Sequence, residues 1–209
     1  GKASAFNTII KILYDVEMIY IGFDCKDPLP SKITSKITKR DGELDNDDNI
    51  IIYLDTYFDK SNAYYFSVNP FGTQRDGRIA DNGNTIDAQW DETWYSVVKI
   101  NEDGWSGEIG IPFKSLKYNS KNNVWGINVG RNVARSLETS YSSWSLTNQN
   151  RVSQFGALSN LELSELDIKR FSLIPYTQLK IQESSKPDAE VGLNIRYNFS
   201  SNVGAEATI

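Results

Sequence analysis

Short runs of aromatic and β-branched residues recur along the chain, and clusters of Asn, Asp, Gly and Ser separate them. Such side chains fit the pleated, half-buried surface of a strand, and the polar clusters favour turns. No long segment repeats its apolar residues at the spacing of a helix. The sequence therefore predicts an all-β protein built as an antiparallel β-sandwich. The expected strands are 8–15, 18–25, 49–57, 63–70, 94–100, 105–113 and 124–131, with 140–147 as a further candidate.

Alternation within two of these runs separates a core face from a polar face. In WSGEIGIPF, Trp105 and Ile109 share one face and Glu108 lies on the other. In VWGINVGR, Trp125 has the parity of the core, whereas Asn128 has the opposite parity and lies between two glycines. A polar side chain flanked by glycines leaves room for a flat ligand to approach.

The stretch DDNIIIYLDTYFDKSNAYYFSVNPFGTQRDG, residues 47–77, is expected to form two neighbouring core strands followed by a turn. The turn falls at residues 69–72, where Asn, Pro and Gly stand together. Gln74, Arg75 and Asp76 then read as a loop at the end of the sandwich. Loops in that position commonly carry binding residues.

The composition excludes several classes of site. The chain has no histidine, which removes the usual zinc ligand, the Ser-His-Asp relay and the Cys-His pair. Cys25 is the only cysteine, so no disulfide forms within the chain. A net charge of -5 argues against a nucleic-acid partner, because clustered Lys and Arg hold such partners. No apolar run is long enough for a transmembrane helix, and the first residues lack the apolar region of a signal peptide.

Tryptophans beside polar segments indicate a sugar-binding site. Two flat aromatic rings can clamp a sugar through its C–H groups, while carboxylate, amide and guanidinium groups bond its hydroxyl groups. Trp94 and Trp144 lie beside such segments, and core packing is the alternative for each. Glu108, Asn128 and Arg131 are the polar candidates, and an ordinary solvated face is the alternative for them.

Acidic residues at both ends of the strand expected at 49–57 suggest a cation site. Asp47, Asp48 and Asp55 carry the oxygen ligands that calcium prefers. The spacing departs from an EF-hand loop because Ile50 takes the place of the required glycine, and a solvated acidic loop is the alternative. Paired carboxylates also serve glycoside hydrolases, but the spacing singles out no pair.

The pattern of apolar and polar residues changes from Phe171 onwards. The segment VGLNIRYNF alternates apolar and polar residues without a break, and a polar turn separates it from FSLIPYTQLKIQ. Strands of about ten residues with this period are typical of outer-membrane barrels, with the apolar face outward. An extra hairpin of a sandwich with one solvated face is the alternative.

Five stretches together resemble one known family. They are ILYDVEMIYIGFDCKDPLP, RDGELDNDDNIIIYLDTYFDKSNAYYFSVNPFGTQRDG, WDETWYSVVKINEDGWSGEIGIPFKSLKY, WGINVGRNVARSLETSYSSW and QFGALSNL. In this order, over about residues 8–165, they resemble family 9 carbohydrate-binding module-like domains. They resemble more closely the subgroup at the front of large outer-membrane barrel proteins. In that subgroup the stretch resembling FSLIPY leads from the domain into the barrel.

The resemblance implies a jelly-roll-like sandwich over residues 1–170 that binds a glycan and is not an enzyme, and the first barrel strands over 171–209. It implies Trp94 and Trp144 as the two rings of a sugar clamp, with Glu108 and Arg131 beside them and often with structural calcium. The family's opening strand and first tryptophan are missing here. The barrel would be the partner of the domain and would place it in the cell envelope, on the periplasmic side of the outer membrane.

Two other interpretations remain beside this one. A sandwich that has lost sugar binding and serves as a structural or docking domain is the alternative function, and a carbohydrate-active hydrolase is a further one. A related superfamily of sandwiches binds haem, but Met18 is the only methionine and histidine is absent, so no axial ligand pair is expected.

Overall fold

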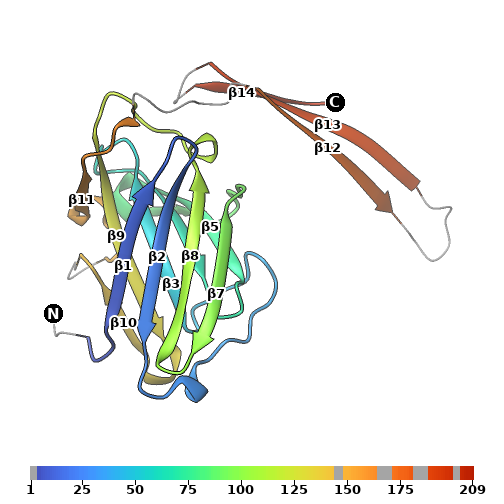
Figure 1. Cartoon of the computed structure of the whole chain (residues 1–209). Helices are drawn as coiled ribbons and strands as arrows, with labels where there is room; N and C mark the ends of the chain where they lie inside the picture. Colours follow the sequence, from blue (N-terminus) through green and yellow to red (C-terminus); the bar gives the residue numbers. More distant parts are fainter. Residues whose placement is uncertain (1–3, 144–147, 164–170, 181–187, 200–202) are drawn as a thin grey trace.

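Two antiparallel sheets stack face to face as a β-sandwich, which confirms the fold class predicted from the sequence (Figure 1). The computed structural model describes residues 4–143, 148–163, 171–180, 188–199 and 203–209. Sheet A has the strand order β1-β2-β8-β7. Its strands are β1 (Thr8–Tyr14), β2 (Met18–Lys26), β7 (Tyr95–Asn101) and β8 (Gly104–Pro112).

Sheet B is the larger layer and has the order β10-β9-β3-β4-β5-β6, with β11 also paired to β9. Its strands are β3 (Asn49–Asp55), β4 (Ala63–Val68), β5 (Gln74–Ala80), β6 (Thr85–Asp87), β9 (Val124–Val133), β10 (Glu138–Tyr141) and β11 (Gly156–Ser159). The connections include short 3-10 helices at Pro30–Lys32, Asp81–Gly83, Phe113–Ser115, Ala134–Ser136 and Val152–Gln154. In the described part of the chain no helix is long and apolar enough to cross a membrane.

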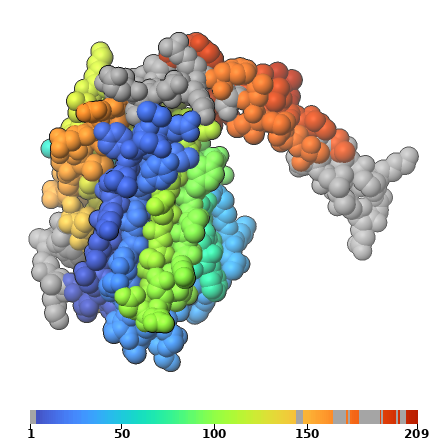
Figure 2. Space-filling view, in the orientation of Figure 1, coloured from blue at the N-terminus to red at the C-terminus, as the bar shows by residue number. Residues whose placement is uncertain are grey.

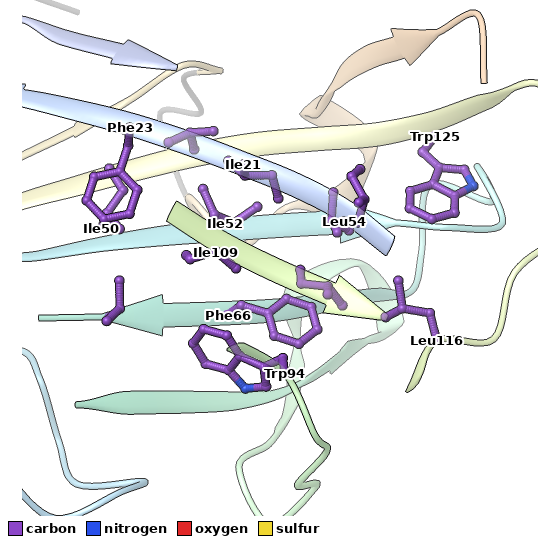
Figure 3. Packing of buried hydrophobic residues seen from close by; sticks show 14 of the residues in the cluster. Ile21, Phe23, Ile50, Ile52, Leu54, Phe66, Trp94, Ile109, Leu116 and Trp125 are labelled. Carbon is purple, nitrogen blue, oxygen red and sulfur yellow. The ribbon is translucent and has the colours of Figure 1, made fainter. Parts of the chain in front are cut away.

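The main core lies between the two sheets, where alternate residues of each strand point inward. Ile21 and Ile109 from sheet A meet Ile52 and Phe66 from sheet B, and all four are fully buried (Figure 3). Trp125 closes one end of this layer, also fully buried. The alternation read from the sequence therefore identifies the core face correctly.

β5 forms where the sequence predicted a loop. It pairs with β4 on one side and β6 on the other, so tertiary pairing overrides the weak strand propensity of its sequence QRDGRIA. The turn predicted just before it is present: Gly72 donates its N–H to the Asn69 carbonyl (2.9 Å) and takes a φ of 80°. Arg75 and Asp76 consequently have strand alternation and point to opposite faces of sheet B.

The last described residues form a separate three-stranded sheet, the arm, which extends away from the sandwich (Figure 1). Its strands are β12 (Phe171–Lys180), β13 (Asp188–Asn198) and β14 (Gly204–Thr208). At its root Arg196 donates to the Glu92 carboxylate at 3.0 Å, an ion pair that joins the arm to the sandwich.

Candidate functional site

A hollow of about 380 Å³ lies on the outer face of sheet B, the face turned away from sheet A. Tyr53 on β3, Tyr65 on β4 and Tyr141 on β10 line it together with Arg75 and Asn150. We call this hollow the tyrosine cavity. The tyrosines belong to a second apolar cluster behind the main core, so sheet B is covered with apolar side chains on both faces.

Glycines on neighbouring strands let two of these rings lie against the sheet. The register places Tyr65 opposite Gly77 and Tyr141 opposite Gly130. A Cβ added to Gly77 would stand 2.5 Å from the Tyr65 hydroxyl oxygen, and one added to Gly130 would stand 2.8 Å from the Tyr141 ring. Both distances are shorter than real Cβ contacts, so the absence of a side chain at each glycine shapes the cavity floor.

The hydroxyl groups of the cavity are neutral and partly free. Tyr53 and Tyr141 share a hydrogen bond, and burial raises the pKa of both phenols, so each remains protonated at neutral pH. The hydroxyl group of Tyr65 is buried and meets no partner with good hydrogen-bond geometry, although the Arg75 guanidinium lies beside it. A buried hydroxyl without a partner costs free energy, and because this oxygen lies against Gly77 it belongs to the floor of the cavity.

Charged groups stand at the rim of the tyrosine cavity. Arg75 lies 3.9 Å from Asp45, whose side chain is 85% exposed, so this ion pair is loose. The cavity therefore combines aromatic faces with a guanidinium, a carboxylate and the Asn150 amide. Such a set suits a neutral ligand that carries many hydroxyl groups.

Trp94 does not present a ring for stacking, contrary to the expectation of a clamp. It is 4% exposed, packs edge-on against Phe66 and donates its indole N–H to the Asp76 carboxylate (3.1 Å). The physical reason is that a polar partner from β5 satisfies the indole inside the core. Trp144 lies outside the described residues.

The polar candidates Glu108, Asn128 and Arg131 are not brought together. Glu108 is exposed on β8 of sheet A, on the other side of the molecule from the tyrosine cavity. Arg131 is 3% exposed and points between the sheets, where its guanidinium donates to the Asn7 carbonyl (3.0 Å). Asn128 is 1% exposed, and its side chain bonds the backbone of Ser143 in both directions, so it anchors the chain after β10.

Comparison with known families gives the class of this domain. Residues 1–162 match the family described as "Carbohydrate family 9 binding domain-like". The chain belongs to this family. Its members are non-catalytic carbohydrate-binding modules, which confirms the expectation that the domain is not an enzyme.

Solved structures show the same fold at low sequence identity. A family 9 module from Caldicellulosiruptor kristjanssonii in complex with cellotriose is 19% identical, with a TM-score of 0.56 over 76% of each chain. The complex of a family 9 module from that organism with glucose gives 20% identity and a TM-score of 0.56, over 76% of this chain and 78% of the other. The crystal structure of a protein from Bacteroides uniformis, described as a "putative carbohydrate-binding protein", gives a TM-score of 0.60 at 15% identity. The match covers 74% of this chain and 78% of the other. No curated protein matches the chain.

The three aspartates expected to bind calcium in this family 9-like domain do not form one site. Asp48 and Asp55 are seven residues apart on an extended strand, which separates them by about 23 Å. Asp47 accepts hydrogen bonds from the N–H groups of Lys36 and Ile37 at 2.9–3.0 Å. Asp48 and Asp55 likewise accept backbone N–H groups. These carboxylates hold loops in place, and the donors around them do not fit a shared cation.

One other acidic group comes together among the described residues. Asp41, Asp76 and Asp91 have carboxylate oxygens within 4.8 Å of one another. Arg40 lies among them and is 2.7 Å from both Asp76 and Asp91, so a guanidinium already supplies the positive charge.

The family 9-like domain thus has a cavity that the sequence did not reveal. Arg75 was predicted in a loop, and the three tyrosines were read as ordinary strand residues. Cross-strand pairs of a tyrosine with a glycine could have indicated the cavity. Such pairs can be recognised only when the register of the strands is known.

Proposed function

We propose that this family 9-like domain binds a sugar in the tyrosine cavity, without catalysis. The observation that carries the proposal is the cavity itself, which is lined by aromatic and polar side chains and has a volume of about 380 Å³. This volume lies in the usual range for small-ligand sites and suits one or two sugar rings. The complexes of the structural neighbours with glucose and cellotriose support a glucose-based ligand.

Binding would rest on two kinds of contact. Sugar C–H groups would pack on the half-buried Tyr141 ring, and hydroxyl groups would bond Arg75 and Asn150, while the buried Tyr53 and Tyr65 rings form the floor of the cavity. Tyrosine rings are rigid and offer both an apolar face and a polar tip. Because the cavity is open to solvent on one side, we expect a modest affinity.

Isothermal titration with glucose and cellotriose tests the proposal. Arg75→Ala removes a guanidinium from the rim, and we expect Kd to rise about tenfold, as for the loss of one charge-assisted hydrogen bond. Arg78→Ala is the matched control, because Arg78 is on the same strand but pairs with Asp87 outside the cavity (2.7 Å). Equal affinity in the Arg75→Ala variant would show that the sugar does not bind in the cavity, and no binding by the folded chain would favour a docking domain that has lost sugar binding.

We further propose that residues 171–209 are the first strands of an outer-membrane β-barrel, with the sandwich on the periplasmic side. The register of the arm supports this, because it places Phe171 opposite Tyr197 and Leu173 opposite Ile195 on one apolar face. Phe171 is 56% and Leu173 52% exposed. The other face carries Ile174 but also Asn194 and the ion pair between Arg196 and Glu206 (3.2 Å).

Strands with one apolar and one polar face, about ten residues long, match a barrel wall between lipid and a polar lumen. Leu173→Arg would put a charge into the lipid and lower the heat-modifiable, folded fraction in outer membranes of cells that express the protein. Asn194→Arg, on the polar face of the same arm, is the control. If both variants assemble equally well, the apolar face does not contact lipid.

Protection of the sandwich from protease in intact cells, lost after permeabilisation, would support the periplasmic side.

A further inference from the structure

A flat apolar strip crosses the outer face of sheet A. The register aligns Leu13, Tyr20, Gly110 and Tyr95 in one row, with one residue from each of the four strands. Leu13 is 72% and Tyr95 53% exposed. Figure 2 shows this face, formed by the blue and green strands, as an open surface with no other described strand lying over it. We call these four residues the tyrosine row.

The two rings of the tyrosine row are spaced and held as a platform. Gly110 separates them, so their Cα atoms are two strand spacings apart, about 10 Å. A Cβ at Gly110 would lie 3.7 Å from the Tyr20 ring, which shows that this ring lies next to the bare backbone. The Tyr20 hydroxyl donates to the Asp15 carboxylate (3.0 Å), which fixes the orientation of the ring before any ligand binds.

Hydrogen-bonding groups stand in the adjoining row. The register aligns Lys11, Gly22, Glu108 and Val97 beside the tyrosine row. Among the described residues, neither the Lys11 ammonium nor the Glu108 carboxylate makes a side-chain hydrogen bond or an ion pair. A free donor and a free acceptor therefore flank the aromatic strip.

We propose that the tyrosine row is a second carbohydrate surface, which takes an extended, β-linked glucan chain lying flat across sheet A. The flat C–H faces of such a chain match the exposed Tyr95 ring and the half-buried Tyr20 ring, and its hydroxyl groups match Lys11 and Glu108. The two Cα atoms are about 10 Å apart and the Tyr20 ring lies beside Gly110, between them, so one extended chain can contact both rings. A stable protein partner would need a broad apolar centre, whereas charged residues flank this strip within one row.

The surface is independent of the tyrosine cavity, since the two lie on opposite sheets. It gives Glu108 a role that the cavity does not. The two sites also differ in the ligand length they favour. The tyrosine row should bind a chain that contacts both rings more tightly than a single sugar, whereas the cavity can hold a single sugar.

Isothermal titration of the 209-residue chain with cellohexaose tests the proposal. The titration is made in an Arg75→Ala, Asn150→Ala background, so that the cavity contributes little. Tyr20→Ala and Tyr95→Ala are each expected to raise Kd about tenfold, the loss of one stacking contact. Lys99→Ala is the matched control, because Lys99 is exposed on the same strand as Tyr95 but lies outside both rows, and it should change Kd less than about twofold. Far-ultraviolet circular dichroism confirms that each variant folds.

The outcomes separate the two sites. Loss of cellohexaose binding on Tyr95→Ala, with glucose binding unchanged in the otherwise native chain, supports the tyrosine row. If cellohexaose binding persists in both tyrosine variants, or is absent in the background, the proposal is overturned. If the native chain binds cellohexaose but not glucose, the cavity proposal fails and the tyrosine row still stands. Sedimentation that shows a dimer, dissociated by Tyr95→Ala, would identify a second copy of the chain as the occupant and overturn the glucan.

Discussion

Asp47 shows how a buried carboxylate can serve the fold. It is fully buried and accepts hydrogen bonds from two backbone N–H groups and from the Asn69 amide (2.9 Å). We expect Asp47→Ala to lower the free energy of unfolding by about 3 kcal/mol, because the buried Asn69 amide and two partly buried N–H groups lose their shared acceptor. Asp45→Ala, at an 85% exposed side chain, should change it by less than about 0.5 kcal/mol. Urea denaturation measures both.

The hydrogen bonds of this carboxylate also predict how removal of calcium affects stability. Because the Asp47, Asp48 and Asp55 oxygens accept backbone N–H groups, we expect the urea midpoint to be the same in calcium and in EDTA. A midpoint that falls in EDTA would restore the calcium site expected from the sequence.

Cys25 is predicted to be unreactive in the folded protein. Burial raises the pKa of its thiol to about 12, above an ordinary value of 9.0. An unfolded thiol therefore loses its proton first as the pH rises, so the stability held by the folded thiol is present below pH 9 and is lost between about 9 and 12. We expect no reaction with a disulfide reagent at pH 8 without denaturant, and a stability difference from Cys25→Ala that falls by up to about 1.4 kcal/mol per pH unit above 9. Rapid labelling of the native protein would contradict this.

Individual residues also show what the sequence could and could not predict. Alternation alone predicts Trp105 and Trp125 in the core, because every second residue of a strand points to the same face. It could not place Trp94, which stands just before β7 and is satisfied by Asp76, 18 residues away. A polar sequence neighbourhood indicates exposure only when no distant polar partner exists.

At the scale of the strands, the floor of the tyrosine cavity depends on a glycine of β5. A methyl group at Gly77 would meet the Tyr65 hydroxyl at 2.5 Å and the Asp87 carbonyl at 2.6 Å. We expect Gly77→Ala to destabilise the domain by about 1–3 kcal/mol through overpacking, and to weaken sugar binding by displacing the ring. Gly22→Ala is the control for stability, since its nearest neighbour would be at 3.8 Å. Thermal melts and glucose titrations of both variants measure the two effects, and a Gly77→Ala variant as stable as Gly22→Ala would refute the steric argument.

The strands themselves were largely predictable, and the cavity was not. The run NIIIYLD is rich in β-branched and aromatic residues, which favour a strand, and it forms β3 as predicted. β5 carries no such signal and exists because β4 and β6 pair with it. Since Arg75 belongs to β5 and the tyrosine rings meet glycines across strands, the site arises from register, which no single segment specifies.

For the whole molecule, we predict that the sandwich unfolds independently of the arm. The described link between them is the ion pair between Glu92 and Arg196, whose side chains are 14% and 27% exposed. Removing the arm returns the Glu92 carboxylate to solvent, so losing this pair costs about 1 kcal/mol. A chain that ends at residue 163 should therefore melt cooperatively within about 3 °C of the full chain, and Glu92→Gln should mimic it. A large fall in Tm on truncation, seen by calorimetry, would show that the arm contributes to the sandwich core.

Sheet B separates the main core from the tyrosine cavity, and this shared wall has a practical consequence. A sugar that bridges Arg75 and Tyr141 would tie β5 and β10 together, and these strands must part when the domain unfolds. A ligand that binds only the folded state adds about 2.7 kcal/mol of stability at a concentration one hundred times Kd. The melting temperature thus becomes a reporter of occupancy, and a panel of glycans ranked by thermal shift would reveal the ligand without a labelled sugar or an enzymatic readout.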